Sequence, residues 1–383
     1  MKSWMWRLIA MISWMGPVGC SDVGFKSQPN KLCVQYQNDF GSEGCVLTPD
    51  GFNQFNYHVN VGEVDILVVN DNSTSMYVEQ SEMALRFPGF LDSIYRLDYR
   101  LGMITTDTRA AFNGGGLLTF PNGQKMLANS SRVMDATHQN NITWFQNTVK
   151  RQETLDCQAS GYTSPSCPSG DERGIFAMNM ALDRTDQRGF FRPGGHLAVI
   201  ILSDEDERSN GGNISGYPLE NYDMPLTFVQ KTKQILGATK TVSVHSIIIR
   251  PTNDGANDST DIACYNAQNN QGSGVKGFVG TQYAALSNPS NALKAAGNII
   301  DGTLGNICSN NYTTELGNIA SKINQTLSTI QLPCKPEQNL VDVSFNPAPA
   351  QQVYYTIDAD NRIQLNPAAP AGTRVNLKFK CKI

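Results

Sequence analysis

The chain has 383 residues, 40% of them hydrophobic, and a formal net charge of −4 at pH 7 from 30 basic and 34 acidic side chains. A chain of this length can bury a full-sized core and still add a smaller module. Because the charge is nearly balanced and the Lys and Arg residues are scattered, the composition argues against a nucleic-acid-binding protein.

Residues 1–19 have the features of an export signal. A basic start is followed by an apolar stretch over residues 8–15, too short to span a bilayer, and by the small-residue segment GPVGC. The ending at Cys20 resembles the lipobox of bacterial lipoproteins, with Pro17 where that motif usually has leucine. The resemblance implies that residues 1–19 are removed and that Cys20 carries a lipid anchor. The alternative is an ordinary secreted protein.

The same resemblance implies a location in a bacterial cell envelope. Ser21, rather than an aspartate, follows the lipidated cysteine, which favours the outer membrane, on its periplasmic or surface face. Residues 20–61 are then a lipidated N-terminal segment, expected to be part spacer and part packed against the main domain. No second stretch of the sequence is long and apolar enough for a membrane helix.

The cysteine count supports an exported protein. Removing Cys20 from the nine cysteines leaves eight, an even number, as expected of disulfide bonds in an oxidising compartment. A zinc site is the alternative, but the sequence has no CxxC and no nearby pair of histidines. The grouping of the cysteines along the chain predicts the bonds Cys33–Cys45, Cys157–Cys167, Cys264–Cys308 and Cys334–Cys381.

Residues 62–328 alternate between the periodicities of strands and helices. Short apolar runs typical of buried strands are EVDILVVN (63–70), YRLGMITTD (99–107), HLAVIILSD (196–204) and TVSVHSIIIRP (241–251). Helices are expected over residues 77–97, with a kink or break near Pro88, and over 173–183, 225–236 and 313–327. This alternation predicts an α/β domain with a doubly wound, mainly parallel sheet.

Polar side chains follow two of these strands. Asp71, Ser73 and Ser75 come directly after the first, and Asp204 ends the third. In a doubly wound sheet, ligands bind beyond the carboxyl ends of the strands. Carboxylate and hydroxyl oxygens suit a hard cation, Mg²⁺ above all, with Mn²⁺ or Ca²⁺ as alternatives. With so few carboxylates, the ion would keep positive charge and attract an acidic group of a partner.

The segment VDILVVNDNSTSM resembles the first strand and metal-binding loop of von Willebrand factor type A (VWA) domains, and LAVIILSDEDE is similar to their later aspartate-bearing strand. The resemblance implies a VWA, Rossmann-like fold over residues 62–328. It also implies that Ser73 and Ser75 bind the metal directly, and that Asp71 and Asp204 hold it largely through water. The wider pattern is similar to VWA-containing lipoproteins of Gram-negative bacteria.

The middle loop of this family normally supplies a threonine just before a helix. Glu172, in GDERG, stands in that place, where it is expected either to bind the metal or to cap the helix. Thr163 and Ser169 are the alternative ligands. The acidic residues 205–207 are expected to form a solvated loop beside the metal.

After residue 328 the pattern changes. LVDVSFN, QVYYTIDADNRIQLN and TRVNLKFKCKI alternate apolar and polar residues, with Pro and Gly turns between them. Residues 329–383 are therefore expected to form a small antiparallel β module, whose limited core depends on the bond Cys334–Cys381.

The sequence favours binding over catalysis. It has no G-x-S-x-G elbow and no HExxH, and His196 and His245 are expected to pack within strands. The expected function is a membrane-anchored adhesion or binding protein whose cation engages a carboxylate of a protein or glycan partner. Two alternatives stay open: a metal-independent scaffold for envelope assembly, and a secreted hydrolase whose serine and histidine base meet only in the fold.

Overall fold

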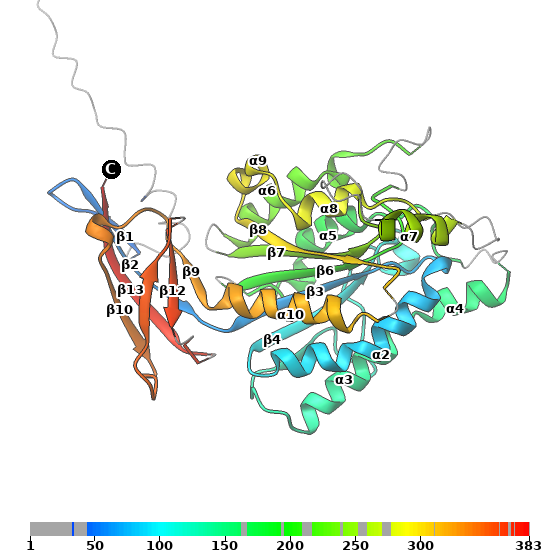
Figure 1. The fold of residues 1–383 in the computed structure, drawn as a ribbon, viewed down its shortest axis with the longest axis horizontal. Helices are drawn as coiled ribbons and strands as arrows, with labels where there is room; N and C mark the ends of the chain where they lie inside the picture. Colours follow the sequence, from blue (N-terminus) through cyan, green and yellow to red (C-terminus); the bar gives the residue numbers. More distant parts are fainter. Residues whose placement is uncertain are drawn as a thin grey trace, which may run out of the picture.

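The computed structural model shows an α/β domain and a separate β module (Figure 1). Cys20 and the predicted signal peptide lie outside the described residues, as does Thr163. Within the described residues, no helix combines the length and apolar character needed to cross a membrane. The structure describes residue 33 and residues 44–161, 167–192, 195–208, 217–237, 240–251, 259–269, 277–309, 311–359, 361–366, 369–370 and 372–382.

The described part of the α/β domain is built on a six-stranded sheet with the order β5-β4-β3-β6-β7-β8. Neighbouring strands are parallel, except that the edge strand β5 runs antiparallel to β4. The order steps outward in both directions from β3, which confirms the predicted doubly wound, mainly parallel sheet. The strands are β3 (Glu63–Asn70), β4 (Asp98–Thr105), β5 (Leu127–Asn129), β6 (His196–Leu202), β7 (Thr241–Ile248) and β8 (Ile299–Asn306).

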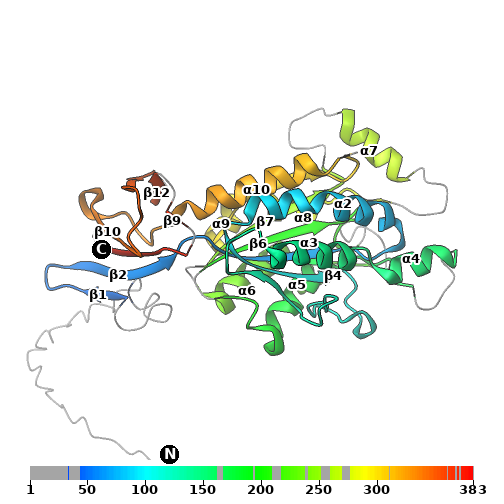
Figure 2. The ribbon, with the colours of Figure 1, turned by 90° about the horizontal axis from the view of Figure 1, so that it is seen from below.

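Helices cover both faces of this sheet (Figures 1 and 2). Val68 of β3 enters the core beneath α2, α3 and α10, and Val69 enters the core beneath α5, α6 and α8. Because β3 is buried on both faces, its sequence is an almost continuous apolar run. The helices are α2 (Tyr77–Ile94), α3 (Ala136–Val149), α4 (Gln152–Ala159), α5 (Gly174–Asp183), α6 (Pro225–Leu236), α7 (Ser259–Asn269), α8 (Thr281–Ser287), α9 (Asn291–Ala296) and α10 (Thr313–Leu327); η1 (Thr74–Met76) is a 3-10 turn.

Helix α2 runs through Pro88 without a break. Proline has no N–H to donate to the carbonyl of Ala84, one turn earlier. The side-chain amide of Gln146, in α3, donates to that carbonyl over 2.9 Å. The neighbouring helix therefore supplies the hydrogen bond that proline removes.

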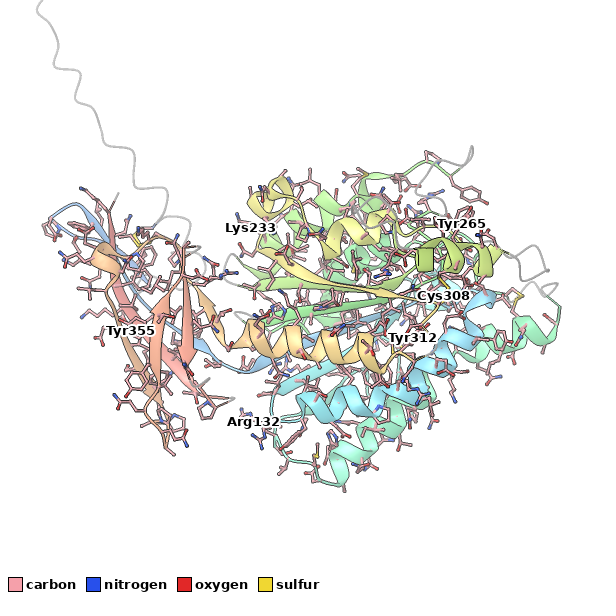
Figure 3. All side chains as sticks on the ribbon, viewed as in Figure 1. Arg132, Lys233, Tyr265, Cys308, Tyr312 and Tyr355 are labelled. Carbon is pink, nitrogen blue, oxygen red and sulfur yellow. A yellow bond between two sulfur atoms is a disulfide. The ribbon has the colours of Figure 1, made fainter. Side chains whose placement is uncertain are left out.

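The β module consists of two antiparallel sheets with the orders β1-β2-β13-β10 and β11-β12-β9. Its core includes the stacked rings of Phe55 and Phe379, whose centroids are 5.1 Å apart. Tyr355, labelled in Figure 3, joins the two sheets, since its hydroxyl donates to the carbonyl of Val341. The strands are β1 (Cys45–Leu47), β2 (Phe52–Asn60), β9 (Thr329–Gln331), β10 (Val341–Asn346), β11 (Tyr354–Ile357), β12 (Arg362–Asn366) and β13 (Arg374–Lys382).

The β module takes strands from both ends of the described chain. β2 pairs along its whole length with β13 and then leads into β3 of the α/β domain. Residues 45–60 therefore share a sheet with the C-terminal strands, whereas the sequence division assigned them to a separate N-terminal segment. Periodicity identifies strands but not their partners, and these two partners lie at opposite ends of the chain.

The four predicted disulfide bonds are all present. Cys33–Cys45 and Cys334–Cys381 lie in the β module, and Cys157–Cys167 and Cys264–Cys308 lie in the α/β domain. The last of these ties α7 to the loop after β8. Each bond therefore joins segments within one of the two bodies.

Candidate functional site

Three loops meet at the carboxyl end of the six-stranded sheet. The hydroxyl of Ser75 donates to Oδ1 of Asp204 over 3.1 Å, and the hydroxyl oxygens of Ser73 and Ser75 are 3.0 Å apart. After burial, the charge of Asp71 is the strongest influence on the pKa of Glu172, which it raises, so these two carboxyl groups are neighbours. The structure thus brings together the five predicted residues Asp71, Ser73, Ser75, Glu172 and Asp204, which we call the acidic cluster.

Asp71 connects the loops after β3 and β6. Its N–H donates to the carbonyl of Leu202 over 3.0 Å. Its Oδ1 accepts from the N–H of Ser73 over 2.8 Å, an Asx-type turn that bends the chain out of the strand. Its Oδ2 accepts from the hydroxyl of Ser203 over 2.6 Å. The two oxygens of Asp71 are thereby fixed by its own loop and by the loop after β6.

The three carboxyl groups of the acidic cluster are completely buried. Burial raises the pKa of Asp71, and it raises the pKa values of Glu172 and Asp204 well above the usual range. The charges of Asp71 and Glu205 raise these two pKa values further. The neighbouring charges that act most strongly on Glu172 and Asp204 are all carboxylates, so the cluster repels itself when ionised.

Two oxygen atoms of the cluster lack a hydrogen bond. Oε1 of Glu172 and Oδ2 of Asp204 are buried and have no hydrogen-bond partner among the described residues. Buried polar atoms are normally satisfied, so these two require an explanation. Carboxylate and hydroxyl oxygens are the ligands that Mg²⁺, Mn²⁺ and Ca²⁺ prefer. A divalent cation bound among them would offset the repulsion, so these residues fit the predicted ion.

The donor set of the cluster is mixed. In the described part of the chain, no group of three or more His, Cys, Asp or Glu side chains could by itself hold a metal ion. Ser73 and Ser75 supply the further oxygens, and both lie in the turn that opens α2. An ion in this cluster would therefore depend on the hydroxyls as well as on the acids.

Glu172 lies just before α5 and points into the cluster. The hydroxyl of Thr106 donates to its Oε2 over 2.5 Å. The N-terminus of α5 is capped by Glu207 instead, whose two carboxylate oxygens accept from backbone N–H groups of the first turn over 2.7 and 3.0 Å. The capping role considered for Glu172 thus belongs to another residue.

Ser169 supports this loop without reaching the other candidate ligands. Its N–H donates to Asp107 over 2.8 Å, and its hydroxyl accepts from the N–H of Asp171 over 3.0 Å. Both contacts shape the turn that leads to Glu172. Ser169 therefore acts in the described contacts as a turn residue.

The prediction of a solvated acidic loop at residues 205–207 is wrong. Each of the three is at most 8% exposed. Asp206 accepts from the N–H of Gln282 at the start of α8, and burial raises the pKa of Asp206 to about 7. Glu207 caps α5, as described. Helix N-termini attract carboxylates, and the sequence did not reveal that two such N-termini meet this loop.

Thr106 was absent from the predicted site. It follows the buried strand β4, is itself completely buried, and binds Glu172. A signal was present, because TTD at the end of β4 repeats the pattern of polar residues that end or follow a buried strand. The hydroxyl of Thr106 therefore contacts the acidic cluster through Glu172.

A second polar network lies inside the sheet, away from the acidic cluster. The hydroxyl oxygen of Ser243 is 2.8 Å from Nε2 of both His196 and His245. Burial lowers the pKa of each histidine to about 3. A serine beside a histidine base is what the hydrolase alternative requires, but Ser243 is 0% exposed and offers no hydroxyl to a substrate.

A cavity of about 820 Å³ lies between the α/β domain and the β module. Its lining includes His196, Lys322 and Arg362. His196 begins β6, whereas Asp204 follows the end of the same strand. This cavity and the acidic cluster therefore lie at opposite ends of the sheet.

No protein-family model and no curated protein matches this chain. Solved structures are distantly similar, and the likeness concerns the fold alone. They include the pilus adhesin SpaC from Lactobacillus rhamnosus GG, with 12% identity, 88% of this chain and 44% of that chain covered, and a TM-score of 0.33. A von Willebrand factor type A protein from Catenulispora acidiphila has 10% identity, 87% and 60% coverage, and a TM-score of 0.36. The manganese-loaded TRAP protein of Plasmodium vivax has 15% identity, 51% and 61% coverage, and a TM-score of 0.27.

This chain spans less than half the length of the SpaC chain, 44% of it. One of the similar structures, that from Catenulispora acidiphila, is of a von Willebrand factor type A protein, the family that the sequence resembles.

Proposed function

We propose that this chain is a non-enzymatic adhesion or binding protein that holds a divalent cation, Mg²⁺ foremost, in its acidic cluster and engages a carboxylate of a protein or glycan partner. One observation carries the proposal: three mutually repelling carboxyl groups are fully buried, and two of their oxygens have no partner among the described residues. Buried carboxylates must be protonated or paired with positive charge. The adjoining serine hydroxyls are further oxygen ligands of the kind that Mg²⁺ uses, so we infer an ion rather than protons.

The residues of the acidic cluster have different roles in the proposed function. Ser73 and Ser75 supply neutral oxygens that fix an ion without cancelling its charge. Asp71 is fixed by Ser203 and the Ser73 N–H, and so holds the loops in register. Glu172 and Asp204 carry the unpartnered oxygens. A bound cation would be the positively charged group that an acidic group of the partner engages.

The proposal also gives the protein a location. A lipid on Cys20 anchors it in a bacterial cell envelope, with the outer membrane favoured, as the resemblance of the N-terminus to lipoproteins implies. The variant Cys20→Ser is expected to move from the membrane fraction to the soluble fraction. A variant that stays with the membrane would contradict the anchor.

Cation binding is tested by calorimetric titration of Mn²⁺ and Mg²⁺ into the chelator-treated protein. The wild type is expected to bind one equivalent and to gain about 2.7 kcal/mol of unfolding free energy at 100 times the dissociation constant. Asp204→Asn should lose both effects. Asp342→Asn is the matched control, because it makes the same change at an exposed position of β10. Equal binding by wild type and Asp204→Asn would overturn the proposal.

The partner is tested by affinity capture from envelope extract, with and without EDTA. Wild-type protein should retain a partner only without EDTA, and Asp204→Asn should retain none in either condition. Capture by both proteins regardless of chelator would refute the metal-dependent function and support the scaffold alternative.

A further inference from the structure

The residues that separate the candidate ligands of the first loop contact α4. The hydroxyl of Thr154 donates to the carbonyl of Asn72 over 2.7 Å, and the side chain of Asn72 donates to Glu153 over 3.3 Å. The hydroxyl of Thr74 donates to Sγ of Cys157 over 3.0 Å. Along residues 71–75, odd-numbered side chains therefore join the acidic cluster, and even-numbered residues bind α4.

Gln80 of α2 completes this attachment. Its side-chain amide donates to the carbonyl of Asp71 over 2.8 Å and to the hydroxyl of Thr154 over 3.3 Å. Its side-chain oxygen accepts from the N–H of Arg151, just before α4, over 2.9 Å. Helix α4 lies at the end of the α/β domain that is remote from the β module (Figure 2). The first loop is thus packed between α2 and α4.

A disulfide bond then joins α4 to the loop of Glu172. Cys157 is bonded to Cys167, five residues before Glu172. The carbonyl of Cys167 accepts from the guanidinium of Arg109 over 3.1 Å, which holds this segment on the loop after β4. The loop of Ser73 and Ser75 and the loop of Glu172 are therefore linked through Thr74 and one covalent bond.

We propose that the Cys157–Cys167 disulfide, with Thr74, positions the two loops relative to each other and so sets the affinity of the acidic cluster for a divalent cation. This inference rests on the proposed function. Mg²⁺ demands nearly ideal ligand distances, so a small shift of one loop relative to the other would change its affinity. Changing groups that orient metal ligands typically costs 10–100-fold in affinity. A disulfide that only stabilised the domain would not have this effect.

The test compares two disulfides that close loops of similar length. Cys157→Ser/Cys167→Ser removes a bond with a sequence separation of 10, and Cys33→Ser/Cys45→Ser removes one with a separation of 12 in the β module. The Mn²⁺ dissociation constant is measured by calorimetry. Hydrogen exchange of amides 72–76 is measured in the metal-free protein. The first variant should bind Mn²⁺ about tenfold more weakly and exchange these amides about tenfold faster, with the control within about twofold of wild type.

Thr74→Val provides a second test that keeps the disulfide and the side-chain volume. It should weaken Mn²⁺ binding about threefold and speed exchange at the same amides, because it removes only the contact with Cys157. Unchanged affinity and exchange in Cys157→Ser/Cys167→Ser, or equal losses in the control, would overturn the inference. If Cys157→Ser/Cys167→Ser does not fold, then wild-type Mn²⁺ affinity and wild-type amide exchange in Thr74→Val would overturn the inference. A wild type that binds no Mn²⁺ would refute the proposed function, and metal-free exchange would still decide the positioning role.

Discussion

Strand β3 has a buried aspartate near each end, and their surroundings are opposite. Asp65, near the amino end, is 1% exposed and accepts from Lys240 over 2.6 Å and from Arg192 over 2.8 Å. Asp71, after the carboxyl end, is 0% exposed and lies beside Glu172. A buried carboxylate that is paired with Lys and Arg side chains of the same chain needs no proton or external cation to balance its charge. One surrounded by acids and hydroxyls is satisfied only by a proton or by a cation from outside.

The polar groups around Asp65 form a network at the amino end of the sheet in which each charged group has a partner, and this supports the distinction. Arg192 also bonds to Asp98 and to the carbonyl of Val64, and Lys240 also donates to the carbonyl of Arg192. These bonds tie together the starts of β3, β4 and β7. In the acidic cluster, by contrast, two carboxylate oxygens remain unbonded among the described residues. The first network therefore satisfies its own charges, whereas the second leaves the oxygens to which the proposed function assigns a cation.

The largest expected effect is at Asp65. Asp65→Asn leaves the buried Lys240 without its ion-pair partner and Arg192 with Asp98 alone, and should lower the free energy of unfolding by about 3–5 kcal/mol in urea denaturation. Asp71→Asn is the matched control in the presence of EDTA. It removes a like charge from Glu172 and Asp204, so the free energy of unfolding should stay the same or rise. Equal losses from both substitutions would contradict the comparison.

The pH dependence of stability tests the amino end of the sheet through its buried histidine, His196. Burial lowers the pKa of His196 to about 3 from an ordinary value of 6.5, and the nearby positive charge of Lys240 acts in the same direction. Between these values the unfolded chain binds more protons, so stability is lost as pH falls below 6.5. His196→Gln removes one such group, and its stability loss from pH 7 to pH 5 should be about 2 kcal/mol smaller than that of wild type.

Unfolding free energies at several pH values check this expectation. The carboxyl groups of the acidic cluster have raised pKa values, so they act in the opposite sense and lose stability as pH rises. Comparing His196→Gln with wild type at each pH cancels that contribution, since the cluster is the same in both. Parallel pH profiles for the two proteins would show that His196 is not a buried neutral group.

The sequence predicted those parts of the fold in which burial leaves a local pattern. β3 and β6 are buried on both faces and appear as apolar runs. The polar residues after them could be assigned to one site, because the carboxyl ends of parallel strands share an edge. Asp71, Ser75 and Asp204 were accessible to sequence reasoning for this reason.

The parts of the fold and of the site that were not predicted depend on contacts between distant residues, which leave no local pattern in the sequence. β8 was not predicted, because IIDGTLGN is half-exposed and contains two glycines. A Cβ on Gly302 would lie 1.7 Å from the carbonyl oxygen of Val244, so glycine is required where β8 approaches β7. The buried acids 205–207 and the pairing of β2 with β13 likewise follow from distant partners.

The smallest effect expected from the comparison of the two ends of β3 concerns Thr106, which contacts the acidic cluster from outside. The hydroxyl of Thr106 donates to Glu172, and a hydrogen bond to a carboxylate favours its ionised form. Thr106→Val keeps the shape but removes the donor, so Mn²⁺ affinity should fall by about fivefold, equivalent to about 1 kcal/mol.

Thr105→Val is the matched control for this change. Thr105 is the neighbouring buried residue, and its hydroxyl is directed to the carbonyl of Phe112, not to the cluster. Calorimetric Mn²⁺ titration should therefore give the wild-type affinity for Thr105→Val and a weaker one for Thr106→Val. Equal affinities for the two variants would mean that Glu172 does not depend on Thr106. The contrast between the two ends of β3 would then rest on Asp71 and Asp204 alone.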